Sequence, residues 1–232
     1  MACQQAADDR QTSQPTENSA VTETITTSKI SQPTPNIAPK TEEKFSLLLE
    51  LPYDTVESDE VCTAPVVIEF FAYQCPHCYK LEEFAANWRK NNAGKIQFRP
   101  IPTDLGNKKF GSFLIVHHAA EKIGMIEVVI PALFERLHEQ KKGFSSLDDA
   151  IAFLVSLGAS EQDAKQAIED QKAIEKAVKE DFRLLSKYKI SGVPTVLVNH
   201  HYQFSVTKAG GYDKVFEVVD ETLKLTSHCS KK

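Results

Sequence analysis

Two cysteines, Cys75 and Cys78, stand three residues apart in the segment FFAYQCPHCYK, directly after an apolar run. Such a pair can ligate a metal, form a structural staple, or make and break a disulfide during a reaction. A structural zinc ion needs about four ligands, as two such pairs or as one pair with suitably spaced histidines. None of the seven histidines has the spacing that would complete this pair. The motif therefore favours redox chemistry and no metal.

The chain also has two pairs of adjacent histidines, His117–His118 and His200–His201. Adjacent residues point to different faces of a helix or a strand, so we expect neither pair to chelate one ion. We interpret all four as ordinary surface or core histidines.

The cysteine pair follows a predicted buried strand at 65–73 and opens a predicted helix. Unpaired backbone N–H groups and a positive dipole favour a thiolate at the start of a helix. We expect Cys75 to be the exposed sulfur that exchanges with substrate and Cys78 to be the buried sulfur that resolves the mixed disulfide. Pro76 suits an early helical position. The imidazole of His77 can carry positive charge beside Cys75, which would make the disulfide a stronger oxidant, unless His77 is merely solvated.

Hydrophobic periodicity predicts the elements that position this pair. The stripe of Leu81, Phe84, Ala85 and Trp88, set against a Glu/Arg/Lys face, predicts a helix that ends near Gly94. Strands are expected at 45–51, 95–101 and 193–199, the last continued by a hairpin partner in HHYQF. From 105 to 187 the pattern is helical, with helix starts at Ser146 and Ser160, and a final helix is expected at 213–225.

Composition excludes several classes of protein. The 232 residues are 41% hydrophobic and 25% charged, as in a soluble globular protein, and the net charge of −5 argues against nucleic acid as a partner. No run of 18 apolar residues is present. Residues 1–42 are rich in Thr, Ser and Pro and predict a disordered tether. Its Ala2-Cys3 resembles the end of a bacterial lipoprotein signal without the apolar part, so Cys3 is either a lipid anchor or an incidental cysteine.

Two motifs carry a family resemblance. FFAYQCPHCYKLEEF resembles the active site of the DsbA family in the thioredoxin superfamily, the periplasmic dithiol oxidases of Gram-negative bacteria, and SGVPTVLVN is similar to that family's cis-proline loop. The resemblance implies an α/β thioredoxin fold with an inserted α-helical domain. The implied parts are a thioredoxin-like first part at 43–104, an inserted helical domain at 105–187 and a thioredoxin-like second part at 188–232.

The resemblance also implies roles for individual residues. Val193 and Pro194 would face the active disulfide, with the backbone of Val193 pairing with extended substrate. Glu69, in the strand VVIEFF, would lie below the disulfide and assist proton movement at the buried sulfur; a solvated, edge-facing glutamate is the alternative. The family pairs this acid with a lysine on the next strand, where this chain offers Arg99 instead.

Cys62 and Cys229 are the two remaining cysteines. Cys62 precedes the strand that leads to the motif, and Cys229 follows the final helix, which packs back on the sheet in a thioredoxin fold. A structural disulfide between them is a hypothesis, and the alternative is two loose thiols.

The sequence thus predicts a thiol:disulfide oxidoreductase that donates its Cys75–Cys78 disulfide to newly exported proteins and needs no separate cofactor. The resemblance implies a monomer in the periplasm of a Gram-negative bacterium, tethered to a membrane if Cys3 is acylated. Its implied partners are reduced, unfolded proteins and a quinone-linked membrane oxidase of the DsbB type. The alternatives are a reductase or isomerase of the same fold and a non-catalytic peptide-binding module.

Overall fold

The structure is a computed structural model that describes residues 51–60 and 64–225. Several expectations fall outside these residues. They are the tether at 1–42, most of the strand expected at 45–51, and the cysteines Cys3, Cys62 and Cys229.

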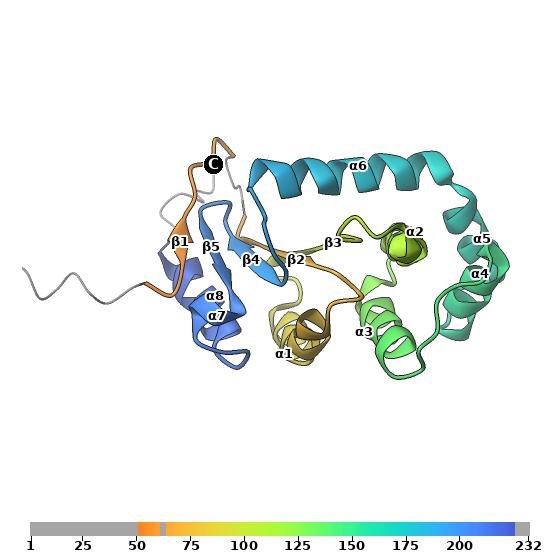
Figure 1. The fold of residues 1–232 in the computed structure, drawn as a ribbon, viewed down its shortest axis with the longest axis horizontal. Helices are drawn as coiled ribbons and strands as arrows, with labels where there is room; N and C mark the ends of the chain where they lie inside the picture. Colours follow the sequence, from red (N-terminus) through yellow and green to blue (C-terminus); the bar gives the residue numbers. More distant parts are fainter. Residues whose placement is uncertain (1–50, 61–63, 226–232) are drawn as a thin grey trace, which may run out of the picture. The chain divides into compact units, whose positions relative to one another are not determined.

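A mixed sheet of five strands forms the centre of the described chain (Figure 1). The strands are β1 (Asp54–Thr55), β2 (Val66–Phe71), β3 (Gln97–Pro102), β4 (Thr195–Val198) and β5 (Tyr202–Ser205), in the order β1-β5-β4-β2-β3. β2 pairs in parallel with β3, and the other neighbours are antiparallel. The three main strands agree with those expected at 65–73, 95–101 and 193–199, and β5 is the expected hairpin partner.

β2 is the central strand, and all six of its residues are buried. A strand that is covered on both faces needs a continuous apolar run, and VVIEFF provides one apart from its glutamate. Val67 packs against the helices α1 (Pro76–Asn92) and α8 (Val215–Lys224) on one face, whereas Ile68 and Phe70 pack with Leu184 of the helix α6 (Gln171–Lys187) on the other. Burial on both faces fixes the register of β2, and with it the place where the strand ends.

Helices supply the other layers. They are α1 (Pro76–Asn92), α2 (Gly111–Lys122), α3 (Ile126–His138), α4 (Leu147–Ser156), α5 (Glu161–Glu169), α6 (Gln171–Lys187), α7 (Val206–Ala209) and α8 (Val215–Lys224), with a 3-10 turn, η1, at Lys108–Phe110. The side chains of Ser146 and Ser160 accept hydrogen bonds from the backbone at the starts of α4 and α5, as the sequence predicts. Periodicity did not predict α7 or the two-residue strand β1.

The helices α2 to α6 lie between β3 and β4 in the chain and form the inserted helical layer. Their largest apolar cluster includes Phe113, Leu133 and Phe134, and it also takes in Tyr73 and Cys78 from the active-site segment. The inserted helices therefore form one wall around the cysteine pair. Within 51–60 and 64–225, none of the helices combines the length and apolar character that a membrane span requires.

Candidate active site

Cys75 occupies the position immediately before α1, with extended backbone angles, and Pro76 follows as the first helical residue. The Cys75 N–H donates to the carbonyl of Ala72 (3.0 Å), and the N–H of Tyr79 donates to the carbonyl of Cys75 (3.1 Å). This connection turns the chain from the end of β2 into a helix within four residues. It leaves the half-buried Cys75 sulfur at the positive end of α1.

The surroundings of Cys75 favour its thiolate. A hydrogen bond from the Cys78 thiol, helped by the backbone N–H groups of Cys78 and His77 and by the charge of His77, lowers the Cys75 pKa to about 6, against the opposing effect of burial. Such a sulfur is largely ionised at neutral pH and is a good leaving group. Both cysteines are free thiols in this structure.

Cys78 has the opposite character. Only 1% of it is exposed, and burial, followed by its hydrogen bond to Cys75, raises the pKa of the Cys78 thiol far above its ordinary value. The charges of Cys75 and Glu69 act in the same direction. The two sulfurs of one helical turn therefore hold different protonation states at neutral pH.

The loop before β4 faces the cysteine pair. β4 runs antiparallel to β2, and Thr195 at its start pairs with Phe70 at the end of β2, so 193–194 lies at the edge where Cys75 begins α1. The Val193–Pro194 peptide bond is cis, and the Cys75 sulfur lies 3.7 Å from the carbonyl oxygen of Val193. The topology thus unites two motifs that are 118 residues apart in the chain.

His77 is exposed on the first turn of α1. Its Nδ1 lies 2.5 Å from the hydroxyl oxygen of Tyr212, and the two rings stack with centroids 6.3 Å apart. Sequence analysis missed Tyr212, which sits in the loop between α7 and α8. The Gly-Gly pair directly before it was a usable signal, because such pairs mark tight turns that present the next side chain.

Glu69 is 3% exposed, which excludes the solvated, edge-facing alternative. Burial, reinforced by the charge of Glu82 and opposed by Arg89, raises the Glu69 pKa to about 8. Glu69 shares a face of β2 with Val67, which packs against α1, so the acid lies on the side of the sheet that carries the cysteines, and its charge contributes to the raised pKa of Cys78. A carboxyl group with this pKa can give and take a proton near neutral pH.

The pairing of Glu69 with Arg99 is not found. In the parallel pair of β2 and β3, Arg99 is aligned with Ile68, whereas Glu69 is aligned with Pro100. Successive side chains alternate between the faces of a sheet, so Arg99 lies on the face opposite to Glu69. The cation that acts on Glu69 is Arg89 of α1.

Arg89 and Glu82 form a buried ion pair that the sequence did not predict. Two nitrogens of Arg89 contact the two oxygens of Glu82, at 2.7 and 3.1 Å, and Arg89 also binds Glu127 of α3 at 2.8 Å. The predicted polar face of α1 is therefore wrong at these two residues, since both are buried. Cys78, Glu82, Ala85 and Arg89 follow one another at intervals of three or four residues and therefore share one face of α1. This spacing could have predicted that Glu82 and Arg89 are buried.

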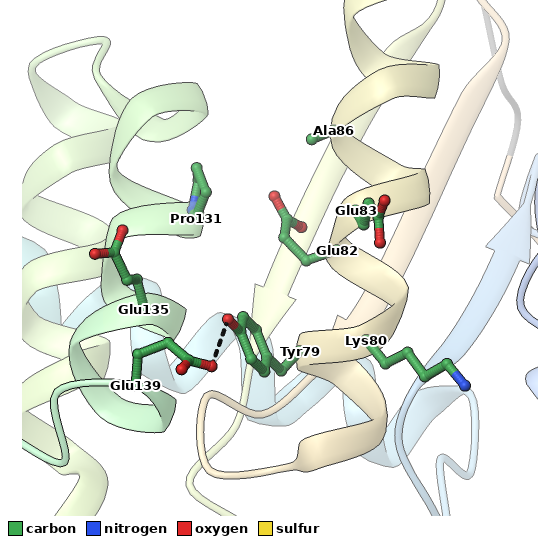
Figure 2. A pocket seen from close by; sticks show the side chains of 8 residues that line it. All are labelled: Tyr79, Lys80, Glu82, Glu83, Ala86, Pro131, Glu135 and Glu139. Carbon is green, nitrogen blue, oxygen red and sulfur yellow. Dashed lines mark hydrogen bonds between the residues drawn. The ribbon is translucent and has the colours of Figure 1, made fainter.

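A pocket of about 720 Å³ lies between α1 and α3 (Figure 2). Four glutamates line it, together with Tyr79, Lys80, Ala86 and Pro131; they are Glu82, Glu83, Glu135 and Glu139. Tyr79 donates a hydrogen bond of 2.9 Å to Glu139 across the pocket, whereas Lys80 points away from it. The pocket adds negative charge on this side of α1.

The adjacent histidines of α2, His117 and His118, lie closer together than the sequence predicts. Donor atoms of His117, His118 and Glu121 lie within 4.8 Å of one another, a spacing that would admit a cation. Protein groups contact the same rings, because His117 Nδ1 lies 2.8 Å from the Tyr73 hydroxyl and His118 lies 3.1 Å from Asp181. The two adjacent rings therefore lie close to each other, contrary to the sequence prediction, and each of them contacts a different side chain of the protein.

Comparison with known proteins agrees with this geometry. A family model described as thioredoxin matches residues 62–221. The thiol:disulfide interchange protein DsbA of Burkholderia cepacia is 28% identical over 176 residues, covering 74% of this chain and 82% of that protein. The protein of the same name from Pseudomonas syringae pv. tomato is 30% identical over 159 residues, covering 68% and 72%. The crystal structure of Pseudomonas aeruginosa DsbA superposes with a TM-score of 0.68 at 24% identity, covering 78% and 95%.

The thioredoxin fold and the paired cysteines at the start of α1 define a thiol:disulfide oxidoreductase. The residues that the family model matches, 62–221, include β2 to β5 and the helices α2 to α6 inserted between β3 and β4. This chain belongs to the DsbA family of thiol:disulfide interchange proteins.

Proposed function

We propose that this protein oxidises cysteine thiols of reduced, unfolded exported proteins by giving them its Cys75–Cys78 disulfide. The observation that carries the proposal is the contrast between the two thiols, with a Cys75 pKa of about 6 and a Cys78 pKa raised by burial. A stabilised thiolate favours the reduced form of the pair, so the disulfide is transferred away. At pH 7 the lowered pKa favours reduction by at most about tenfold, or about 30 mV, and solvent screening of the half-buried sulfur reduces this figure.

The exchange proceeds in two steps. A substrate thiolate attacks the Cys75 sulfur of the disulfide, which forms a mixed disulfide and releases the Cys78 thiolate. Burial disfavours that anion, so it takes up a proton. A second substrate thiolate then attacks the substrate sulfur of the mixed disulfide and expels the Cys75 thiolate, which is a good leaving group. The substrate gains a disulfide and loses two electrons, which the cysteine pair gains.

Two neighbouring groups support these steps in our proposal. Glu69, with a pKa of about 8 and a charge felt at Cys78, supplies the proton to the Cys78 thiolate and recovers it on reoxidation. The backbone of Val193, whose carbonyl lies 3.7 Å from the Cys75 sulfur, pairs with the extended substrate while Pro194 closes the wall behind it. The redox group is part of the chain, so the reaction needs no separate cofactor.

We further propose a partner and a location. The reduced pair must return its electrons, and a quinone-linked membrane oxidase of the DsbB type is the proposed acceptor. The relatives come from Burkholderia and Pseudomonas, which supports the periplasm of a Gram-negative bacterium. We also propose that the protein is a monomer and that its domains span 43–104, 105–187 and 188–232. Finally, we propose a disulfide bridge between Cys62 and Cys229 and acylation of Cys3.

The equilibrium constant with glutathione tests the direction of transfer. We expect a strongly oxidising value, whereas a strongly reducing one would assign the protein to the reductases. Refolding of a reduced, disulfide-containing substrate tests catalysis. We expect Cys75→Ser to abolish it, with Ser145→Ala as a control away from the cysteines. Full activity of Cys75→Ser would instead support a peptide-binding module.

A further inference from the structure

The loop between α7 and α8 reaches the first turn of α1 through one side chain, Tyr212. Its hydroxyl oxygen lies 2.5 Å from Nδ1 of His77. The ammonium group of Lys80 lies 4.4 Å from the centroid of the Tyr212 ring. His77 and Lys80 are three residues apart and share one face of α1, so the ring of Tyr212 contacts two neighbouring cationic or basic side chains there.

The backbone of this loop is built to hold Tyr212 in place. Gly210 ends α7 in the left-handed region with φ +91°, and Gly211 follows with φ +146°. The N–H groups of these glycines donate to carbonyls of α7, and a Cβ on Gly211 would lie 2.9 Å from an oxygen of Asp213. Only glycine suits both positions without strain. The ring of Tyr212 packs against the apolar cluster that joins α1 to α8.

The chemistry of the contact makes it more than packing. A phenol hydroxyl can donate to the bare Nδ1 of a neutral imidazole, and its oxygen can accept from the N–H of a charged one. Tyr212 can therefore hold the His77 ring in one orientation in both charge states. A neutral ring with its proton on Nδ1 can likewise donate to this oxygen, so the contact fixes the orientation of the ring in either tautomer. The charge of His77 is one of the effects that stabilise the Cys75 thiolate, so the placement of this ring matters for the pair.

We propose that Tyr212 is a positioning residue for disulfide exchange: it fixes the His77 ring beside the cysteine pair, so that the α7–α8 loop helps to set how strongly the disulfide oxidises a substrate. The inference rests on the proposed function, since it deepens the part assigned there to the Cys75 thiolate. Tyr212 itself does not exchange electrons or protons with the substrate.

The test is Tyr212→Phe, which removes the hydroxyl and keeps the ring over which Lys80 lies. We expect the equilibrium constant with glutathione to become less oxidising by about twofold, which corresponds to about 0.4 kcal/mol, because the charge of His77 is only one of the effects that lower the Cys75 pKa. The thiolate absorbance of the reduced protein should show a raised Cys75 pKa. Tyr202→Phe is the matched control, because Tyr202 belongs to the same apolar cluster and contacts Tyr53. It should leave both measurements unchanged.

A double-mutant cycle separates this inference from the proposed function. In a His77→Ala background, Tyr212→Phe should have no further effect on the glutathione equilibrium. The inference is wrong if Tyr212→Phe leaves the glutathione equilibrium unchanged, or if it causes the same shift with and without His77. The proposed function is tested separately, because it holds as long as Cys75→Ser is inactive in refolding. The parent protein offers a readout that needs no variant: nitrogen NMR should show the Nδ1 of His77 in a hydrogen bond, and an Nδ1 that behaves like that of a solvated histidine would contradict the inference.

Discussion

Replacing Glu69 by Gln should stabilise the protein increasingly as the pH rises. In the folded protein the Glu69 pKa is about 8, against an ordinary value of 4.5. The folded state therefore binds this proton more tightly than the unfolded chain does, and ionisation of the buried carboxyl group opposes folding. The free energy of unfolding of the parent protein should fall between pH 4.5 and about 8 because of this one group.

The size of the effect follows from the two pKa values. The full difference corresponds to about 5 kcal/mol above pH 8, and about 3 kcal/mol of it is already present at pH 7. Gln has nearly the same shape as Glu and does not titrate in this range. The variant should therefore match the parent near pH 4.5 and exceed it by up to those amounts at higher pH.

Denaturant unfolding of both reduced proteins across this pH range provides the measurement. Titration of Cys75 contributes equally to both curves, so their difference isolates Glu69. Glu83→Gln is the matched control, since Glu83 lies on α1 but is exposed. If the curves of Glu69→Gln and the parent stay parallel from pH 4.5 to 8, the raised pKa and the proton-transfer part proposed for Glu69 are both wrong.

Three further results are expected. The rate of Cys75 alkylation in the reduced parent protein, where the Cys78 thiol keeps its hydrogen bond, should follow a titration well below the ordinary thiol value of 9.0, and a midpoint near 9.0 would contradict the thiolate. Arg89→Met should lower the free energy of unfolding by about 3–5 kcal/mol, because it leaves the buried Glu82 carboxylate without its cation. Adding Glu82→Gln to this variant should restore most of the loss. Calorimetry of the single and the double variant tests both expectations. Contacts with Asp181 and Glu121 raise the His118 pKa to about 9, so its stabilising contribution is complete below pH 6.5 and disappears as the pH rises through about 9. His118→Asn should abolish that dependence, and an unchanged pH–stability profile would refute the buried ion pair.

The sequence predicted those parts of the site that depend on local chemistry. The continuous apolar run of β2, the proline after Cys75 and the serines before α4 and α5 act within a few residues of themselves. Each signal survives in the fold because no distant contact competes with it. The position of Cys75 at the start of α1 followed from such signals alone.

The contacts that sequence analysis missed or misplaced depend on partners from distant elements. The family resemblance offered Arg99 in place of the lysine that pairs with the acid at the position of Glu69, but the register of β2 and β3 places Arg99 on the other face. Glu82 and Arg89 were assigned to solvent by residue type, because a charge that is buried through pairing looks like any surface charge in a sequence. Tyr212 reaches His77 only through the packing of α8 against α1.

The order of the sheet has a consequence for the synthesis of this protein. β2, α1 and both cysteines precede β4 by more than a hundred residues, and β4 brings the Val193 loop. A chain that is made from its N-terminus thus contains its cysteine pair before the loop that carries Val193 has been made. Contacts of such high sequence separation form late. Until β4 has been made, the two cysteines of the nascent chain therefore lack the Val193 carbonyl that lies beside Cys75 in the folded protein.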